Sequence, residues 1–130
     1  MPVPAVATYS IAALVAAHTA FKGLIDAGTG AGSIKIRSAT DVLLAQIPLA
    51  KPCGAVSGTT GQLVFSIAGR DESADASGTA AYGEFCDSGG LVHLALPSQA
   101  GTVAVSGKLV INTLTLAEGG PVEVLSATVG

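Results

Sequence analysis

The stretch that decides the fold is Ser33–Arg37, which reads SIKIR. Polar and apolar residues alternate through it, so Ile34 and Ile36 point to one side, as in a strand with one buried face. Six further strand-like stretches follow, each bounded by Gly, Pro, Ser or Asp, at residues 42–49, 62–68, 80–86, 91–96, 108–116 and 122–129. Their short spacing predicts a mainly β fold, an antiparallel β-sandwich or barrel of about seven to eight strands.

Before this stretch the sequence predicts one amphipathic helix, over about residues 10–27. Ser10 is placed to cap its start, and Gly28 to end it in a left-handed conformation. Alanines supply helix propensity on most of its surface. The remaining apolar stripe, which we expect to pack against the sheet, consists of Ile11, Leu14, Val15, His18, Phe21 and Ile25.

The chain is expected to hold one domain. Residues 1–8 carry Pro2 and Pro4, which restrict φ and disfavour a helix, so this segment is predicted to be an extended arm. Residues 9–130 are enough for a single hydrophobic core. Glycine-rich loops are expected at residues 28–32 and 69–78.

The composition is poor in charge. Charged residues make up 12% of the chain, against about 25% in a typical soluble domain. A surface this apolar is expected to be covered in part by copies of the same chain or by a partner, which predicts a homo-oligomer. The net charge of −3 disfavours nucleic-acid and anionic-membrane partners, because both require a basic surface.

The sequence also bears on where the protein is made. No apolar stretch approaches the roughly 20 residues of a membrane-spanning helix. The first basic residue, Lys22, follows the apolar stretch instead of preceding it as in a signal peptide. We therefore expect synthesis in a cytoplasm, where Cys53 and Cys86 would be buried thiols and not a disulfide.

One set of motifs resembles a chymotrypsin-like serine protease. His18 follows two alanines, Asp41 begins an apolar stretch, and Ser88 lies in an Asp-Ser-Gly-Gly sequence, in the chain order of that family. A chain of 130 residues cannot build the two barrels of that fold, and Cys86 stands where its oxyanion-hole glycine would precede the motif. Residues 87–90 have the composition of a hairpin loop, so we predict no enzyme and no catalytic residue.

Other motifs indicate neither a cofactor nor a metal. The Gly28–Gly32 loop follows a helix and not a strand, so a phosphate would meet the negative end of the helix dipole. Asp71, Glu72 and Asp75 could contact Ca²⁺, but no calcium-binding loop pattern surrounds them. A zinc site would have to be assembled from isolated residues, namely His18, Cys53, Cys86 and His93. We therefore expect solvated loop charges and core residues at these positions.

Several short motifs occur in a fixed order between residues 20 and 95. They are IDAG at 25–28, GAGSIKI at 30–36, LLAQI at 43–47, ADASGTA at 74–80 and DSGG at 87–90. This order of a helix, a Gly-Ala-Gly link and short strands resembles small β-rich virion proteins of tailed bacteriophages. The resemblance implies a structural virion protein of the head decoration or cement type. Only Tyr82 and Phe85 supply aromatic residues in the strand where that family is usually richer in them.

The resemblance implies partners within a virion, namely the major capsid protein or other virion subunits. A cement protein would act through repeated weak contacts that become strong by symmetry and avidity. We expect these contacts to involve the arm and one charged loop, at residues Pro2, Val3, Pro4, Val6, Arg70, Asp71, Glu72 and Asp75. A tail, neck or baseplate component remains an alternative, as does a carbohydrate-binding, adhesin-like sandwich, although the chain has no tryptophan to offer a sugar.

Overall fold

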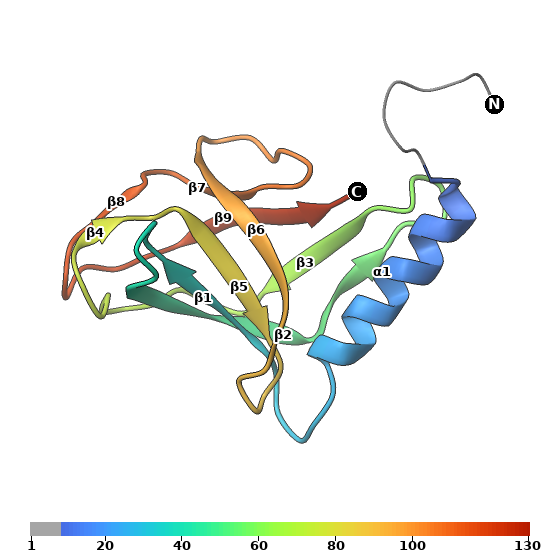
Figure 1. The fold of residues 1–130 in the computed structure, drawn as a ribbon, viewed down its shortest axis with the longest axis horizontal. Coiled ribbons are helices and arrows are strands. Elements are labelled where there is room, and N and C mark those ends of the chain that lie inside the picture. Colours follow the sequence, from blue (N-terminus) through green and yellow to red (C-terminus); the bar gives the residue numbers. More distant parts are fainter. Residues whose placement is uncertain (1–8) are drawn as a thin grey trace.

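The computed structural model describes residues 9–130, which form one helix and nine strands (Figure 1). The helix, α1 (Ile11–Ile25), comes first. The strands are β1 (Ser33–Arg37), β2 (Leu43–Val56), β3 (Leu63–Ile67), β4 (Gly78–Thr79), β5 (Tyr82–Cys86), β6 (Val92–Ala100), β7 (Leu109–Ile111), β8 (Thr115–Leu116) and β9 (Val124–Val129). The predicted mainly β fold with an N-terminal helix is confirmed, whereas the predicted arm lies outside the described residues.

Seven of the strands close into a barrel. Their order around it is β1-β2-β3-β9-β7-β6-β5, and β4 pairs with β8 in a separate two-stranded sheet. The expectation of a purely antiparallel sheet is wrong at one place, because β6 and β7 run parallel, with Ser98 beside Leu109. The loop at residues 101–108 brings the chain back to the level of Ser98. This short loop is long enough for a parallel pairing because β6 and β7 form only three residue pairs.

Several strand boundaries also differ from the prediction. The expected strand at 108–116 is divided, because the chain leaves the barrel after Ile111 and Thr115 then pairs with Thr79. Strand β2 continues through Pro52 to Val56, and β6 continues through Pro97 to Ala100. Prolines predict strand ends locally, but pairing with neighbouring strands carries both segments further.

The core lies inside the barrel, as the alternation in β1 predicts. Ile34 and Ile36 are fully buried, and Phe85 on the neighbouring strand is buried beside them. The ring of Phe85 packs on that of Phe65, with centroids 4.4 Å apart. Burial of these large apolar side chains is the main source of stability that links β1, β3 and β5.

Helix α1 packs on the outside of the barrel, along β2, β3 and β6 (Figure 1). The predicted N-cap is confirmed, because Ser10 Oγ accepts a hydrogen bond from the Ala13 N–H at 3.1 Å. The predicted C-terminal end is wrong by two residues: the helix ends at Ile25 with Asp26 as its C-cap in a right-handed conformation, and the left-handed Gly28, with a φ of +98°, follows in the link to β1. His18 and Ile25 are buried at the contact with the barrel. No helix among residues 9–130 has the length and apolar character needed to cross a membrane.

One member of the predicted packing stripe does not pack. Ile11 is 48% exposed, whereas Leu14, Val15 and Phe21 are half-buried. The reason is its position in the first turn, where the backbone of Ile11, and not its side chain, faces the loop at Gly61. The helix is therefore anchored mainly through its central and last turns.

Candidate interaction surfaces

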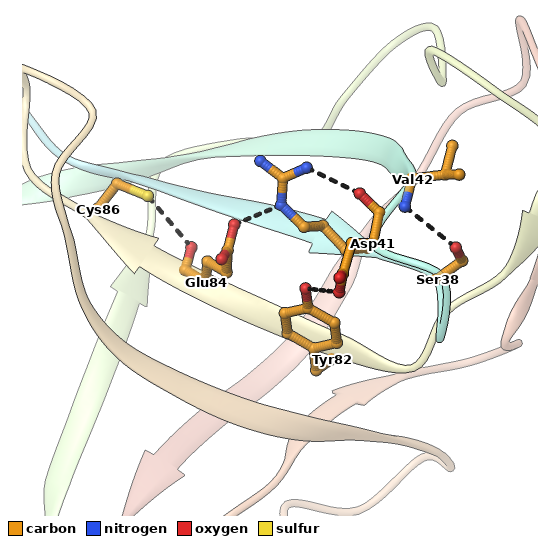
Figure 2. A network of polar contacts seen from close by, with 7 residues as sticks. Ser38, Asp41, Val42, Tyr82, Glu84 and Cys86 are labelled. Carbon is orange, nitrogen blue, oxygen red and sulfur yellow. Dashed lines mark hydrogen bonds and ion pairs between the residues drawn. The ribbon is translucent and has the colours of Figure 1, made fainter.

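The charged residues of β1 and β5 form a polar network on the outside of the barrel (Figure 2). Because Ile34 and Ile36 point inward, Arg37 is directed outward, and it lies opposite Tyr82 in the β1–β5 register. The Arg37 Nε–H donates a hydrogen bond to the carboxylate of Glu84. This bond raises the pKa of the Arg37 guanidinium, which therefore stays charged.

The same network holds the turn between β1 and β2. Tyr82 Oη donates to Asp41 Oδ1 at 2.5 Å, and Figure 2 shows the two side chains pointing toward each other. This hydrogen bond raises the pKa of the Tyr82 phenol. Arg37 donates a second bond to the carbonyl oxygen of Asp41, whose φ is +66°. Arg37, Tyr82 and the Asp41 turn thus supply one another's hydrogen-bond partners, which indicates a structural role for the network.

The predicted hairpin at residues 87–90 is confirmed. Asp87 Oδ1 accepts hydrogen bonds from the N–H groups of Gly89 and Leu91, and Asp87 Oδ2 lies 3.0 Å from His93 Nε2. The contact with His93 and then the bond from Leu91 lower the pKa of the Asp87 carboxyl. The side chain that begins the protease-like motif therefore closes a turn.

The three residues of the protease-like set bond to different partners. His18 donates from Nδ1 to the carbonyl oxygen of Gly61 at 2.5 Å, since a carbonyl can only accept. Asp41 accepts from Tyr82, and Ser88 Oγ donates to the carbonyl oxygen of Ala27 at 3.4 Å. A catalytic triad requires hydrogen bonds from serine to histidine and from histidine to aspartate, and these residues share none.

The glycine-rich loop after α1 presents carbonyl oxygens to the ammonium group of Lys51. Lys51 Nζ donates to the carbonyl oxygens of Gly28 and Gly30, at 2.9 and 3.3 Å. A phosphate site would need N–H groups at this place. A Cβ at Gly28 would lie 2.3 Å from Ser88 Oγ, so the loop also packs tightly on the hairpin. Sequence reasoning identified the helix cap and missed Lys51, which lies 21 residues from Gly30.

The two cysteines are free thiols and both are buried, as predicted. Burial, with Asp26 nearby, raises the pKa of Cys53 to about 12, and burial also raises the pKa of Cys86. Both thiols therefore remain protonated and weakly nucleophilic near neutral pH. Within residues 9–130 no group of three or more His, Cys, Asp or Glu side chains is arranged to hold a metal ion.

The charged loop expected to contact partners is partly tied to the barrel. Asp71 accepts a hydrogen bond from the Gln46 N–H at 2.9 Å, and it lines a shallow groove together with Asp75. The side chains of Arg70 and Glu72 are 49% and 75% exposed and form an ion pair at 3.0 Å. Of the four predicted contact residues in this loop, Arg70, Glu72 and Asp75 are therefore exposed, and Asp71 is half-buried. The four predicted contacts in the arm, Pro2, Val3, Pro4 and Val6, lie outside the described residues.

A second surface was not identified by the sequence reasoning. The outward residues of α1 carry no charge, and Leu24 among them is 47% exposed. Close to the two ends of the helix, Tyr9 is 69% exposed and Leu91 is 64% exposed. The signal that could have revealed this surface is the absence of Asp, Glu, Lys and Arg from residues 1–21.

Comparison of the chain with protein-family models, with curated proteins and with solved structures finds no match.

Proposed function

We propose that this protein is a non-enzymatic structural component of a tailed-phage virion, a decoration or cement protein that stabilises the head by binding the major capsid protein. The observation that carries the proposal is the exposure of large apolar side chains on a chain with 12% charged residues, among them Tyr9, Leu91 and Val103. Exposed apolar surface of this kind favours a protein that functions in an assembly. The phage-like order of motifs between residues 20 and 95 supplies the identity of that assembly.

The internal hydrogen bonding of the polar clusters is consistent with this proposal. Arg37 bonds to Glu84, Tyr82 to Asp41 and His18 to a backbone carbonyl, so these groups serve the fold. A closed barrel also leaves no long free sheet edge, which suits a subunit that must be present in many copies without forming fibrils. Binding would come from many weak, symmetric contacts.

Two surfaces are proposed for the contact with the capsid. The first is the uncharged arm at residues 1–8, and the second is the exposed Arg70–Glu72 pair. Each contact can be weak, because a decoration protein binds at many equivalent positions on one shell.

Co-sedimentation of the purified protein with assembled phage heads that lack it tests the proposal. Saturable binding, at a copy number that matches a symmetry position of the capsid, is the expected result. Absence of binding to heads, together with binding to purified tails or necks, would move the protein to the alternative location. Absence of binding to any of these assemblies would overturn the virion proposal.

Two variants test which surface is used. Deletion of residues 2–8 is expected to weaken head binding and to leave the fold of residues 9–130 unchanged. The charge-swapped pair Arg70→Glu with Glu72→Arg keeps the net charge and the local ion pair, yet reverses the charges that a partner meets. We expect it to reduce binding as well, and Ala104→Glu in an exposed loop serves as the control that does not.

A further inference from the structure

One side chain of β7 is buried outside the barrel core. Leu109 and Ile111 belong to the core cluster, so Val110 between them points to the outer face of the sheet. Its exposed fraction is nevertheless 0%. A Cβ at Gly101 would lie 3.7 Å from Val110 Cγ1, so the loop that follows β6 lies against this side chain. The strand therefore has a cover on its outer face in addition to the core on its inner face.

The cover is the segment of residues 101–107, GTVAVSG, which we call the strap. Within the described part of the chain, three hydrogen bonds attach it to β7 and β9. They run from the Gly101 N–H to the Ile111 carbonyl oxygen at 3.0 Å, from the Gly107 N–H to the Thr128 carbonyl oxygen at 2.9 Å, and from Thr128 Oγ1 to the Val105 carbonyl oxygen at 3.2 Å. The strap is thus attached mainly at its two ends.

The middle of the strap is weakly held. Among residues 9–130, residues 102–104 form no hydrogen bond with the barrel, and Val103 is 72% exposed. A hollow of about 320 Å³ lies beside the first two residues of the strap, next to Leu125. At the other end Gly107 has a φ of +78°, a conformation that glycine adopts without strain. A segment with few hydrogen bonds and few packed neighbours is the kind that opens locally.

A polar group beneath the strap has no hydrogen-bond partner. Ser126 pairs with Val110 in the β7–β9 register, so the two side chains lie on the same outer face. Among the described residues, Ser126 Oγ is the buried side-chain oxygen for which the structure gives no partner. A buried hydroxyl without a partner costs free energy, and contact with water removes that cost. The closed position of the strap therefore carries a penalty that an open position would not.

We propose that the strap opens and closes over β7 and β9 while the barrel stays folded, and that Ser126 weakens the closed position. Opening breaks the hydrogen bonds of Val105 and Gly107 and lets water reach Ser126 Oγ. The strand pairs of the barrel remain, because none of them involves residues 101–107. The open molecule presents Val110 and two hydroxyls on a strip that the closed molecule hides. This inference concerns the chain alone and does not depend on the proposed virion role.

Amide hydrogen exchange of the full chain, followed by NMR at several low urea concentrations, tests the opening. After correction for intrinsic rates, we expect the Gly107 amide to exchange faster than the amides of β1. Urea should hardly change its rate, because lifting the strap exposes little surface. A Gly107 amide as well protected as those of β1 would show that the strap opens only when the protein unfolds, which would overturn the proposal.

A pair of serine variants tests the role of the buried hydroxyl. Ser126→Ala removes it and is expected to slow the exchange of the Gly107 amide about tenfold. Ser98→Ala is the matched control, because Ser98 Oγ already donates to the Ala80 carbonyl oxygen at 2.9 Å, and it should not slow this exchange. An exchange rate that Ser126→Ala leaves unchanged would show that Ser126 does not weaken the closed strap.

Thiol labelling tests which surface the opening exposes. Val110→Cys places a small apolar side chain with a reactive thiol under the strap. We expect the new thiol to react with an aromatic disulfide reagent in native buffer, and Ser126→Ala to slow the reaction. Cys53 and Cys86, both fully buried, serve as internal controls that react only on unfolding. A new thiol that reacts no faster than Cys53 would show that Val110 stays covered, and this too would overturn the proposal.

Discussion

The side of the molecule formed by α1 and β3 differs from the face formed by β1 and β5 in how it is held together. On the α1 side, buried apolar residues and one buried hydrogen bond, from His18 to Gly61, fix the helix to the barrel. On the β1–β5 face, exposed and half-exposed charges are joined in a network around Arg37 and Tyr82 (Figure 2). The contact of α1 with the barrel therefore rests on apolar burial, whereas the network on the outer face of β1 and β5 fixes the local geometry of a turn.

The difference also bears on recognition. On the β1–β5 face, Arg37 and Glu84 bond to each other, so these two charges largely compensate one another. The exposed residues of α1 carry no charge to repel or orient a partner, so a contact there must come from shape and apolar area. Substitutions on the two sides are expected to change the free energy of unfolding by different amounts. Comparing them separates the contribution of apolar packing from that of the charged network.

The largest effect is expected from Ile25→Ala, because Ile25 is fully buried where α1 meets the barrel. Loss of its packing should lower the free energy of unfolding by about 2–5 kcal/mol, as measured by urea titration. Leu125→Ala, at a side chain that is 50% exposed on β9, provides the matched control and should cost about 0.5 kcal/mol or less. Equal losses in the two variants would show that α1 is not anchored through Ile25.

A smaller effect is expected from His18→Phe. The variant keeps a large ring against Phe21 but removes the donor to the carbonyl oxygen of Gly61. A buried carbonyl without a partner should reduce the free energy of unfolding by about 1–3 kcal/mol. Gly61 itself has a φ of +74°, and a Cβ there would lie 2.6 Å from Leu14 Cβ, so the loop has little room to adjust. An unchanged urea midpoint would mean that this hydrogen bond does not hold the helix.

On the charged face, Glu84→Gln should have a still smaller effect. The side chains of Arg37 and Glu84 are 25% and 20% exposed, so water weakens their attraction. We expect a loss of at most about 1 kcal/mol, which should shrink further at high salt. A double-mutant cycle with Arg37→Gln isolates the pair. A coupling as large as the effect of Ile25→Ala would contradict the distinction between the two sides.

The smallest effect concerns pH. Hydrogen bonds from His93 and from the Leu91 N–H lower the pKa of Asp87 below its ordinary value of 3.8. The charged carboxylate therefore stabilises the folded state above that ordinary value, and this contribution is lost as the pH falls through the lower folded-state pKa. Urea midpoints of wild type and Asp87→Asn should differ at pH 7 and converge once the pH has fallen through the lowered folded-state pKa of Asp87. A difference that persists at low pH would assign the effect to hydrogen-bond geometry and not to charge.

Much of the fold can be predicted from local patterns. The alternation in Ser33–Arg37 identifies β1 and its buried residues, and Ser10 marks the start of α1. The composition of residues 87–90 identifies the hairpin. Each of these features depends on residues within a few positions of one another, so the local sequence is enough to predict it.

The candidate sites were less predictable. The protease-like set that the sequence analysis rejected, His18, Asp41 and Ser88, shares no hydrogen bond in the structure. The contacts that exist, such as Tyr82 with Asp41 and Lys51 with Gly28, join residues 41 and 23 positions apart. Motif similarity takes no account of such separations, whereas hydrogen bonds depend only on distance and direction.

The sequence by itself determined that residues 9–130 are mainly β with one N-capped helix at their start, because apolar periodicity and N-caps act locally. The tertiary structure alone decided that the sheet closes into a barrel, that β6 and β7 run parallel, and that residues 108–116 divide between two sheets. These outcomes depend on which distant strands pair and on how much apolar surface each pairing buries, and that competition is settled only when the whole chain packs.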